Sequence, residues 1–109
     1  MEKIKSIIQN SIQVKQEIIN NDKLLETIID VIQIVSNALQ NDRRIYFCGN
    51  GGSAADAQHL AAEFVGRFAM ERVGLPAIGL TTDSSILTAV GNDYGFVQIF
   101  SRQLKPWAV

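Results

Sequence analysis

The sequence predicts an α/β fold in which two N-terminal helices precede a strand–helix–strand unit with parallel strands. Three observations support this fold class. Apolar residues recur at helical spacing over residues 1–40, a short apolar run at 45–47 precedes a glycine-rich turn, and a second short apolar run lies at 77–80. A helix that connects two strands of one sheet favours parallel pairing. With 109 residues, the chain is one domain or part of one.

The first helix is predicted over residues 3–20 and the second over 23–40. An apolar stripe of isoleucines runs along the first helix, and residues 20–22 interrupt the pattern and can cap the second. The second helix is apolar around much of its circumference, and such helices are buried on several sides. We therefore expect residues 1–40 to form a helical hairpin that packs on the sheet domain and on another subunit. A helix buried wholly within its own chain is the alternative.

A glycine-rich turn between the first strand and the following helix is the most informative stretch. The strand is predicted over 44–48, the turn places three glycines and Asn50 in positions 49–52, and a helix follows over 53–68. Glycines let backbone N–H groups approach an oxyanion closely, and the first turn of a helix adds partial positive charge. The turn therefore predicts a site for a phosphate or a polyol phosphate.

Three residues beside this turn carry further expectations. Ser53 should cap the helix, and Asp56 should return the hydrogen bond, as in a capping box. Cys48, the only cysteine, ends a strand predicted to be buried, so we expect it in the core rather than as a reactive thiol. A single cysteine also excludes a disulfide within the chain.

His59 and Glu63 lie four residues apart on the predicted helix, so their side chains share one face. A histidine and a carboxylate at this spacing can hold one metal ion, or one can act as a base that the other orients. The alternative is a solvated surface pair without a function. The neighbouring phosphate-type turn gives the functional interpretation more weight.

The chain after this helix is predicted to continue with a second strand and a short helix. Residues 71–76 form a turn-rich connection, and 77–80 form the strand. The helix is predicted over 84–90, with Thr82 or Asp83 as its cap.

A polar turn over 91–95 then leads to a last helix over 96–104. The side chains expected on the buried face of this helix are Phe96, Ile99, Phe100 and Leu104.

The composition is that of a globular protein, with 47% hydrophobic and 19% charged residues. A net charge of −1 gives no electrostatic reason to expect nucleic acid or an anionic membrane as a partner. No signal peptide is visible, and no apolar run reaches the length of a membrane span. We therefore expect a cytoplasmic protein.

The glycine turn and the residues around it resemble the sugar isomerase (SIS) domain of phosphoheptose isomerases. The resemblance extends from near the start of the chain to about Gln103. Its motifs are the run from Gly49 to His59, then Glu63, Gly66-Arg67, 81–83 and 89–95. It implies a doubly wound parallel sheet of the Rossmann or flavodoxin-like type, of which residues 41–109 would be the N-terminal half. It also implies a homo-oligomer, commonly a tetramer, assembled through residues 1–40.

The resemblance further implies an activity. Phosphoheptose isomerases interconvert sedoheptulose 7-phosphate and D-glycero-D-manno-heptose 7-phosphate, toward ADP-heptose and surface polysaccharides. Glu63 matches the catalytic glutamate, which also binds zinc, and His59 matches a zinc ligand. The positions that match substrate-binding residues are Asn50, Gly51, Gly52, Glu63, Asn92 and Asp93.

A complete SIS domain of this kind is nearly twice as long as this sequence. Its second half would supply another phosphate loop and a glutamine and a histidine that complete the zinc site. Because His59 and Glu63 give two ligands where catalytic zinc usually has three, we expect this chain alone to bind zinc weakly and to have little or no isomerase activity. The unusual tail, residues 105–109, suggests a frameshifted gene, a chosen boundary or a genuine short protein.

Two other functions stay open at this point. One is a non-catalytic SIS protein that binds a protein partner, as in the paralogue that associates with the bacterial replication initiator. That group lacks the glutamate at the position of Glu63, which favours the enzyme here. The other is a sugar-phosphate sensor, in which the loop binds a ligand and only the oligomeric state changes.

Overall fold

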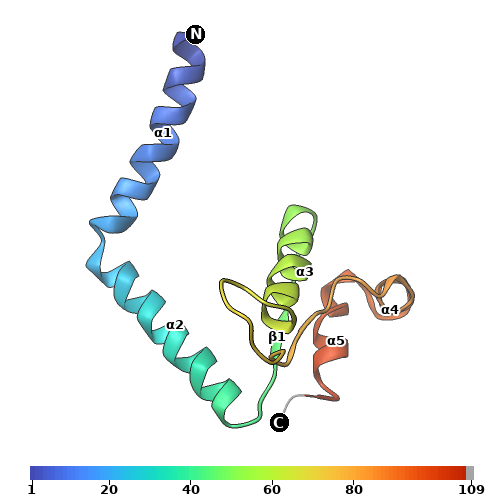
Figure 1. Cartoon of the computed structure of the whole chain (residues 1–109). Coiled ribbons are helices and arrows are strands. Elements are labelled where there is room, and N and C mark those ends of the chain that lie inside the picture. Colours follow the sequence, from blue (N-terminus) through green and yellow to red (C-terminus); the bar gives the residue numbers. More distant parts are fainter. Residues whose placement is uncertain (108–109) are drawn as a thin grey trace. The chain divides into compact units, whose positions relative to one another are not determined.

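The computed structural model describes residues 1–107 (Figure 1). Two compact units divide the chain, one formed by residues 1–37 and the other by the residues from Ala38 onward. The elements in chain order are α1 (Glu2–Ile19), α2 (Asp22–Gln40), β1 (Ile45–Phe47), α3 (Gly52–Val65), β2 (Ala77–Gly79), α4 (Ser84–Tyr94), the 3₁₀ helix η1 (Phe96–Gln98) and α5 (Ser101–Leu104). The predicted α/β fold is confirmed. Among residues 1–107, no helix is both long enough and apolar enough to cross a bilayer.

The two N-terminal helices are confirmed, with a break at residues 20–21. The side chain of Asn21 caps α2, because its Oδ1 accepts a hydrogen bond from the backbone N–H of Leu24 at 3.1 Å. The backbone N–H of Asn20 donates to the carbonyl oxygen of Gln16 at 3.1 Å and closes α1. The asparagines at the break therefore satisfy backbone groups at the ends of both helices.

These helices do not pack side by side, which differs from the expected hairpin. Neither of them contains a buried residue. Whether another subunit or the second unit covers these helices stays a prediction. The exposed isoleucines of α1 include Ile4 at 63%, Ile8 at 55% and Ile12 at 52%. A helical period identifies the apolar side of a helix, but it does not say what covers that side.

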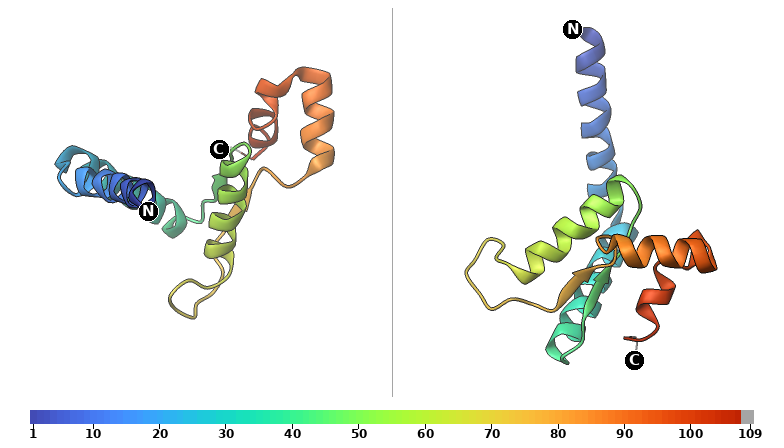
Figure 2. Two further views of the ribbon diagram at one scale, coloured as in Figure 1. Left: turned by 90° about the horizontal axis from the view of Figure 1, so that it is seen from above. Right: turned by 90° about the vertical axis from the view of Figure 1, so that its right-hand side faces the viewer.

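The sheet of the second unit pairs β1 and β2 in parallel, as predicted, with α3 as the crossover between them (Figure 2). Tyr46 lies opposite Ile78 in the register. The pairing continues beyond the strands, where the N–H of Leu80 donates to the carbonyl of Phe47 at 2.8 Å. Both strands therefore end at the same edge of the sheet.

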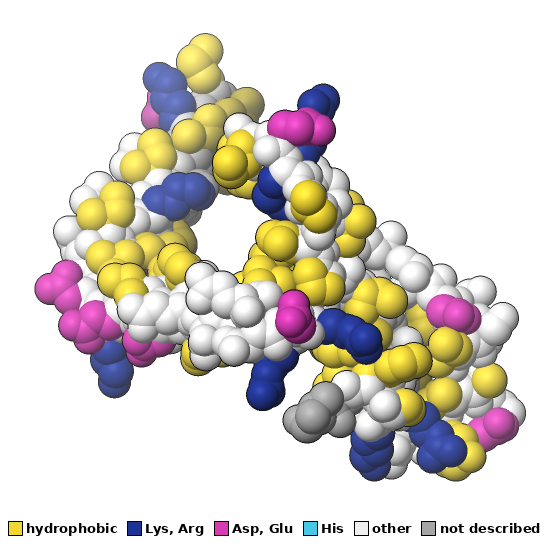
Figure 3. Space-filling model, turned by 60° about the horizontal axis from the view of Figure 1, so that its bottom comes forward, with side chains coloured by type: hydrophobic (Ala, Val, Ile, Leu, Met, Phe, Trp, Pro, Cys, Tyr) yellow, Lys and Arg dark blue, Asp and Glu magenta, His cyan; other side chains and the backbone are white. Residues whose placement is uncertain are grey.

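Helix α3 packs on one face of this sheet and forms the core with it. Ala57 and Ala61 are buried, and the rings of Phe47 and Phe64 lie 5.7 Å apart. Small residues permit the close approach, since a Cβ on Gly79 would lie 3.5 Å from the carbonyl oxygen of Ala57. Other hydrophobic side chains reach the surface, as the face drawn in Figure 3 shows.

Helix α4 begins as predicted and ends later than predicted. Asp83 is its N-cap, with Oδ1 accepting from the N–H of Ile86 at 2.9 Å. Residues 91–94, predicted as a polar turn, form the last turn of α4, and the chain turns at Gly95 with a φ of 99°. Glycine and asparagine lower the helix propensity of this segment, but they do not end the helix by themselves. The helix ends where the next glycine adopts a positive φ.

The predicted helix over 96–104 is divided into η1 and α5. Ile99 is buried, and Phe100 and Leu104 are half-buried, as expected. Phe96 was expected in the core, but its side chain is 66% exposed. The change from α to 3₁₀ geometry shifts the helical face, so the period used for the prediction does not apply there.

Two further expectations concern single side chains. Cys48 is exposed, which contradicts its predicted burial. It follows the end of β1, at the edge of a sheet that has two strands in the described part of the chain. Trp107 lies in the unusual tail, and the guanidinium carbon of Arg44 is 5.8 Å from the centre of its ring. Residues 108–109 of that tail lie outside the described residues.

Candidate functional site

The glycine-rich turn is shaped by Gly51 rather than by Ser53. Gly51 is the N-cap of α3, with φ 59° and ψ −121°, a conformation that strongly favours glycine. The hydroxyl of Ser53 accepts from the N–H of Asn50 at 2.9 Å and donates to the carbonyl of Asn50 at 2.8 Å. The predicted capping box between Ser53 and Asp56 is therefore wrong. The serine closes the turn on itself instead of capping the helix.

A second glycine permits this closure. A Cβ on Gly49 would lie 2.5 Å from the carbonyl oxygen of Ser53, closer than such atoms can approach. In the described residues, the N–H groups of Gly51 and Gly52 donate to no protein acceptor. These two donors stand at the N-terminus of α3, where the helix dipole favours an anion. These two donors suit the oxyanion site that is expected from the sequence, which stays a prediction.

This turn forms one wall of an open pocket of about 550 Å³. Helix α4 forms another wall, and the chain that follows β2 and the segment from Phe96 contribute the rest. The pocket lies beyond the carboxyl ends of both strands, where open parallel sheets bind their ligands. Its lining residues are Gly49, Asn50, Gly51, Ala54, Thr81, Leu87, Thr88, Gly91, Asn92, Phe96, Ile99 and Phe100.

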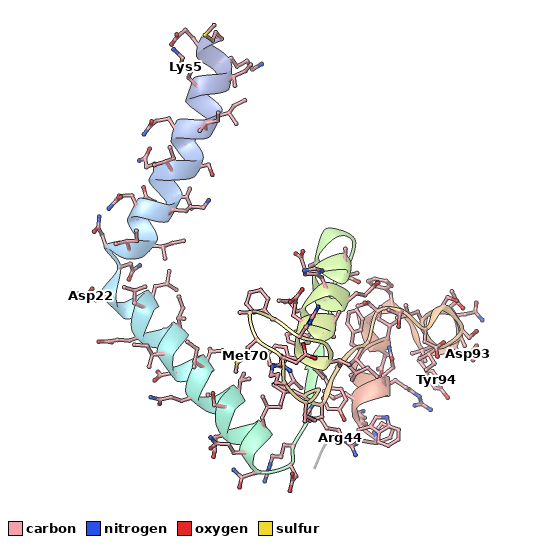
Figure 4. All side chains as sticks on the ribbon, viewed as in Figure 1. Lys5, Asp22, Arg44, Met70, Asp93 and Tyr94 are labelled. Atoms are coloured by element: carbon pink, nitrogen blue, oxygen red, sulfur yellow. The ribbon has the colours of Figure 1, made fainter. Side chains whose placement is uncertain are left out.

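Three of the predicted site residues, Asn50, Gly51 and Asn92, therefore line one pocket. Asn92 lies in the last turn of α4 and donates from Nδ2 to Oδ1 of its neighbour Asp93 at 3.1 Å. Asp93 and Tyr94 end this helix (Figure 4), and Asp93 is absent from the lining. Asp93 can thus orient the Asn92 amide toward a ligand without forming part of the wall.

His59 and Glu63 form a second cluster, farther along α3. Their Nε2 and Oε1 atoms lie 3.2 Å apart, which confirms that they share one face of the helix. The His59 side chain is 75% exposed and that of Glu63 is 32% exposed. From Gly52 to Glu63 the helix rises about 16 Å. The pair and the turn are consequently separate features of this helix, and neither His59 nor Glu63 lines the pocket.

A metal ion could be held by the His59–Glu63 pair, since an imidazole nitrogen and a carboxylate oxygen are both zinc ligands. Within residues 1–107, no group of three histidine, cysteine, aspartate or glutamate side chains is placed to bind a metal. The pair would thus supply two protein ligands, and zinc binding by it stays a prediction.

Two threonines of the pocket were not predicted as site residues. Thr81 follows β2 and donates from Oγ1 to the carbonyl of Ala54 at 3.3 Å. Thr88 donates to the carbonyl of Ser84 at 2.6 Å. The position of Thr81 directly after a strand was a usable signal, because residues at that edge of a parallel sheet face the ligand crevice.

Comparison with known proteins identifies the family. Residues 8–107 match the family model described as "SIS domain". The chain therefore belongs to the SIS domain family.

Its relatives in that family include named phosphoheptose isomerases. It is 56% identical to the phosphoheptose isomerase of Aneurinibacillus thermoaerophilus, over 94% of this chain and 52% of that protein. It is also 56% identical to that of Geotalea daltonii, over 99% of this chain and 55% of that protein. The solved phosphoheptose isomerase of Neisseria gonorrhoeae matches with a TM-score of 0.86 at 44% identity, over 98% of this chain and 54% of that one. The chain thus spans about half the length of these relatives.

Proposed function

We propose that this chain provides the substrate turn and the catalytic glutamate of an isomerase that interconverts sedoheptulose 7-phosphate and D-glycero-D-manno-heptose 7-phosphate, toward ADP-heptose and surface polysaccharides. The observation that carries the proposal is the pocket in which Asn50, Gly51 and Asn92 meet at the N-terminus of α3. The names of the relatives support the reaction class. A cytoplasmic location stays a prediction from the sequence.

In this proposal the turn binds oxygens of the sugar phosphate. The N–H groups of Gly51 and Gly52 stand at the N-terminus of α3, so they suit a phosphoryl oxygen of the substrate. The Asn92 amide, held by Asp93 at 3.1 Å, would donate to or accept from a sugar hydroxyl. These groups fix the substrate without taking part in proton transfer.

Glu63 is the proposed proton carrier. Its carboxylate would remove a proton from carbon 1 of the ketose, which gives an enediol, and return it to carbon 2, while a hydroxyl proton moves from oxygen 1 to oxygen 2. The half-buried carboxylate lies beside His59, whose ring nitrogen is 3.2 Å away. His59 and Glu63 are also the residues that would hold zinc. The ion, when bound, would polarise the substrate carbonyl.

A homo-oligomer is the second part of the proposal, with a tetramer as the expected size. The exposed isoleucine stripe of α1 and the apolar surface of α2 support it. Several large apolar side chains on one helix are stable in water when a second copy covers them. The partner would be another copy of this chain.

A sugar-phosphate sensor is the rival that one observation favours. The pocket around Gly51 is formed within this chain, whereas the described residues give zinc two ligands. Such a sensor would bind the sugar phosphate without converting it. A partner-binding SIS protein of the replication-initiator type is less favoured, because Glu63 is present and contacts His59.

A fusion experiment tests the proposed reaction. This chain would be joined to the second half of the Geotalea daltonii relative, and conversion of sedoheptulose 7-phosphate would be followed in deuterated water. We expect turnover with solvent deuterium at carbon 2 of the aldose, and a loss of at least about 100-fold in Glu63→Gln. Glu71→Gln is the matched control, because Glu71 is exposed and pairs with Arg67 at 2.8 Å. Turnover that survives Glu63→Gln would exclude the proposed role, and binding without turnover would favour the sensor.

A further inference from the structure

The loop that follows α3 holds the end of that helix through one arginine side chain. Arg72 donates from Nη2 to the carbonyl oxygen of Glu63 at 2.8 Å and from Nη1 to that of Phe64 at 2.8 Å. Longer bonds run from Nη1 to the carbonyls of Gly66 and Val73, at 3.3 and 3.2 Å. A single half-buried guanidinium thus binds several carbonyls at and beyond the last turn of α3.

The backbone of the loop completes this arrangement. The N–H of Leu75 donates to the carbonyl of Phe64 at 2.9 Å, and that of Gly66 donates to Ala62 at 2.8 Å. A Cβ on Gly74 would lie 2.5 Å from the carbonyl oxygen of Val65, so the loop lies tightly against the helix end. Met70 lies on this loop (Figure 4). The carbonyls at a helix C-terminus, which usually depend on water, therefore have protein donors here.

Glu63 is one of the residues whose backbone Arg72 holds. Glu63 lies in the last turn of α3, and last turns of helices fray unless they are held. Its own carbonyl oxygen accepts from Arg72, while its side chain contacts His59 at 3.2 Å. A positive charge at a helix C-terminus also stabilises the helix dipole. The Arg72 contact thus restrains the backbone that carries the carboxylate.

We propose that Arg72 is a positioning residue, which fixes the last turn of α3 and thereby holds the Glu63 carboxylate against His59. This inference rests on the proposed function only in that Glu63 is the proposed proton carrier. The contacts among Arg72, Glu63 and His59 are present whatever reaction the chain takes part in. Catalytic groups must be placed accurately, since a shift of about 1 Å can cost about 100-fold in rate. Neighbouring Arg67 does not share the role, because its side chain pairs with Glu71 at the surface.

Two measurements on the chain itself test the inference at a single fixed pH. The first is amide hydrogen exchange in Arg72→Met, where loss of a charged hydrogen bond should raise the exchange of Gly66 and Leu75 about tenfold. The amide of Ala57, buried in the first half of α3, should not change. Arg72→Lys should recover part of the protection, because lysine keeps the charge and loses the planar fork. Glu71→Gln, in the same loop, should leave all three amides unchanged.

The second measurement reads Glu63 directly. His59 is the only histidine, so its ring signals in a carbon–proton NMR spectrum are unambiguous. Glu63→Gln shows where those signals lie without the carboxylate. We expect Arg72→Met to move them toward that position, Arg72→Lys to move them less, and Glu71→Gln to leave them in place.

The two measurements distinguish a structural role of Arg72 from a positioning role. Unchanged exchange at Gly66 and Leu75 would show that Arg72 does not hold the helix end. Faster exchange with unmoved His59 signals would make Arg72 a purely structural residue and overturn the positioning role. Neither readout requires turnover. A fusion protein that fails to convert sedoheptulose 7-phosphate would refute the proposed reaction, whereas hydrogen exchange and the His59 signals would still test the role of Arg72.

Discussion

Replacing Gly49 by alanine tests the close packing of the substrate turn. The added Cβ would lie 2.5 Å from the carbonyl oxygen of Ser53 and 2.7 Å from its Oγ. Overpacking of this kind costs about 1–3 kcal/mol. The same shift would weaken the two hydrogen bonds between Ser53 and Asn50, each worth about 1 kcal/mol. We therefore expect a total loss of about 2–4 kcal/mol in the free energy of unfolding.

The neighbouring glycines provide matched controls. Gly52→Ala has open space and no positive φ, so it should be neutral or stabilising by up to about 1 kcal/mol. Gly51→Ala also has open space, but its φ of 59° should cost about 1–3 kcal/mol through backbone strain. The three substitutions add the same methyl group, so they separate close contact from backbone conformation.

Urea unfolding followed by fluorescence measures these differences. Trp107, the only tryptophan, lies in the second unit beside Arg44, so it reports on the unit that contains the turn. At a typical slope of about 1–2 kcal/mol per molar urea, the midpoint of Gly49→Ala should fall by about 1 M or more relative to Gly52→Ala. Equal midpoints for these two variants would refute the packing of Gly49 on Ser53.

Three further predictions concern the cap, the metal pair and the apolar stripe. Asp83→Ala should destabilise the second unit by about 1 kcal/mol and Asp83→Asn by much less, because an amide oxygen can still accept from Ile86; equal urea midpoints would contradict the cap. Equilibrium dialysis should show weak zinc binding that His59→Asn removes and Cys48→Ser leaves unchanged; tight stoichiometric binding would contradict the count of two ligands. Ile8→Asp should lower the mass measured by light scattering, whereas Gln9→Asp should not; a mass unaffected by either substitution would count against the α1 stripe as an interface.

The sequence predicted the strands and the site turn because both depend on local chemistry. Short apolar runs next to glycine-rich turns identify β1 and β2, and a crossover helix determines that they are parallel. The four-residue spacing of His59 and Glu63 likewise guarantees a shared face on any helix, and the 3.2 Å contact confirms it.

The failures occurred where two local options compete. Ser53 could cap α3 or bond to Asn50, and the positive φ of Gly51 makes the second option available. The composition of residues 91–94 predicts a turn, yet the helix continues to Tyr94 and ends at Gly95, which is its C-cap. Cys48 and the apolar sides of α1 and α2 are exposed, which shows another limit. An apolar pattern shows which surface is suited to burial, but it does not show which part of the protein or which partner buries it.

A sugar-phosphate titration followed by amide NMR tests directly whether the turn before α3 binds the substrate. Sedoheptulose 7-phosphate would be added to the labelled 109-residue chain, with sedoheptulose as the control that lacks the phosphate. We expect saturable shifts of the Gly51, Gly52 and Asn92 backbone amides with the phosphate ester, and weaker shifts with the free sugar. Shifts confined to other residues, or none at saturating ligand, would contradict the assignment of this pocket as the sugar-phosphate site.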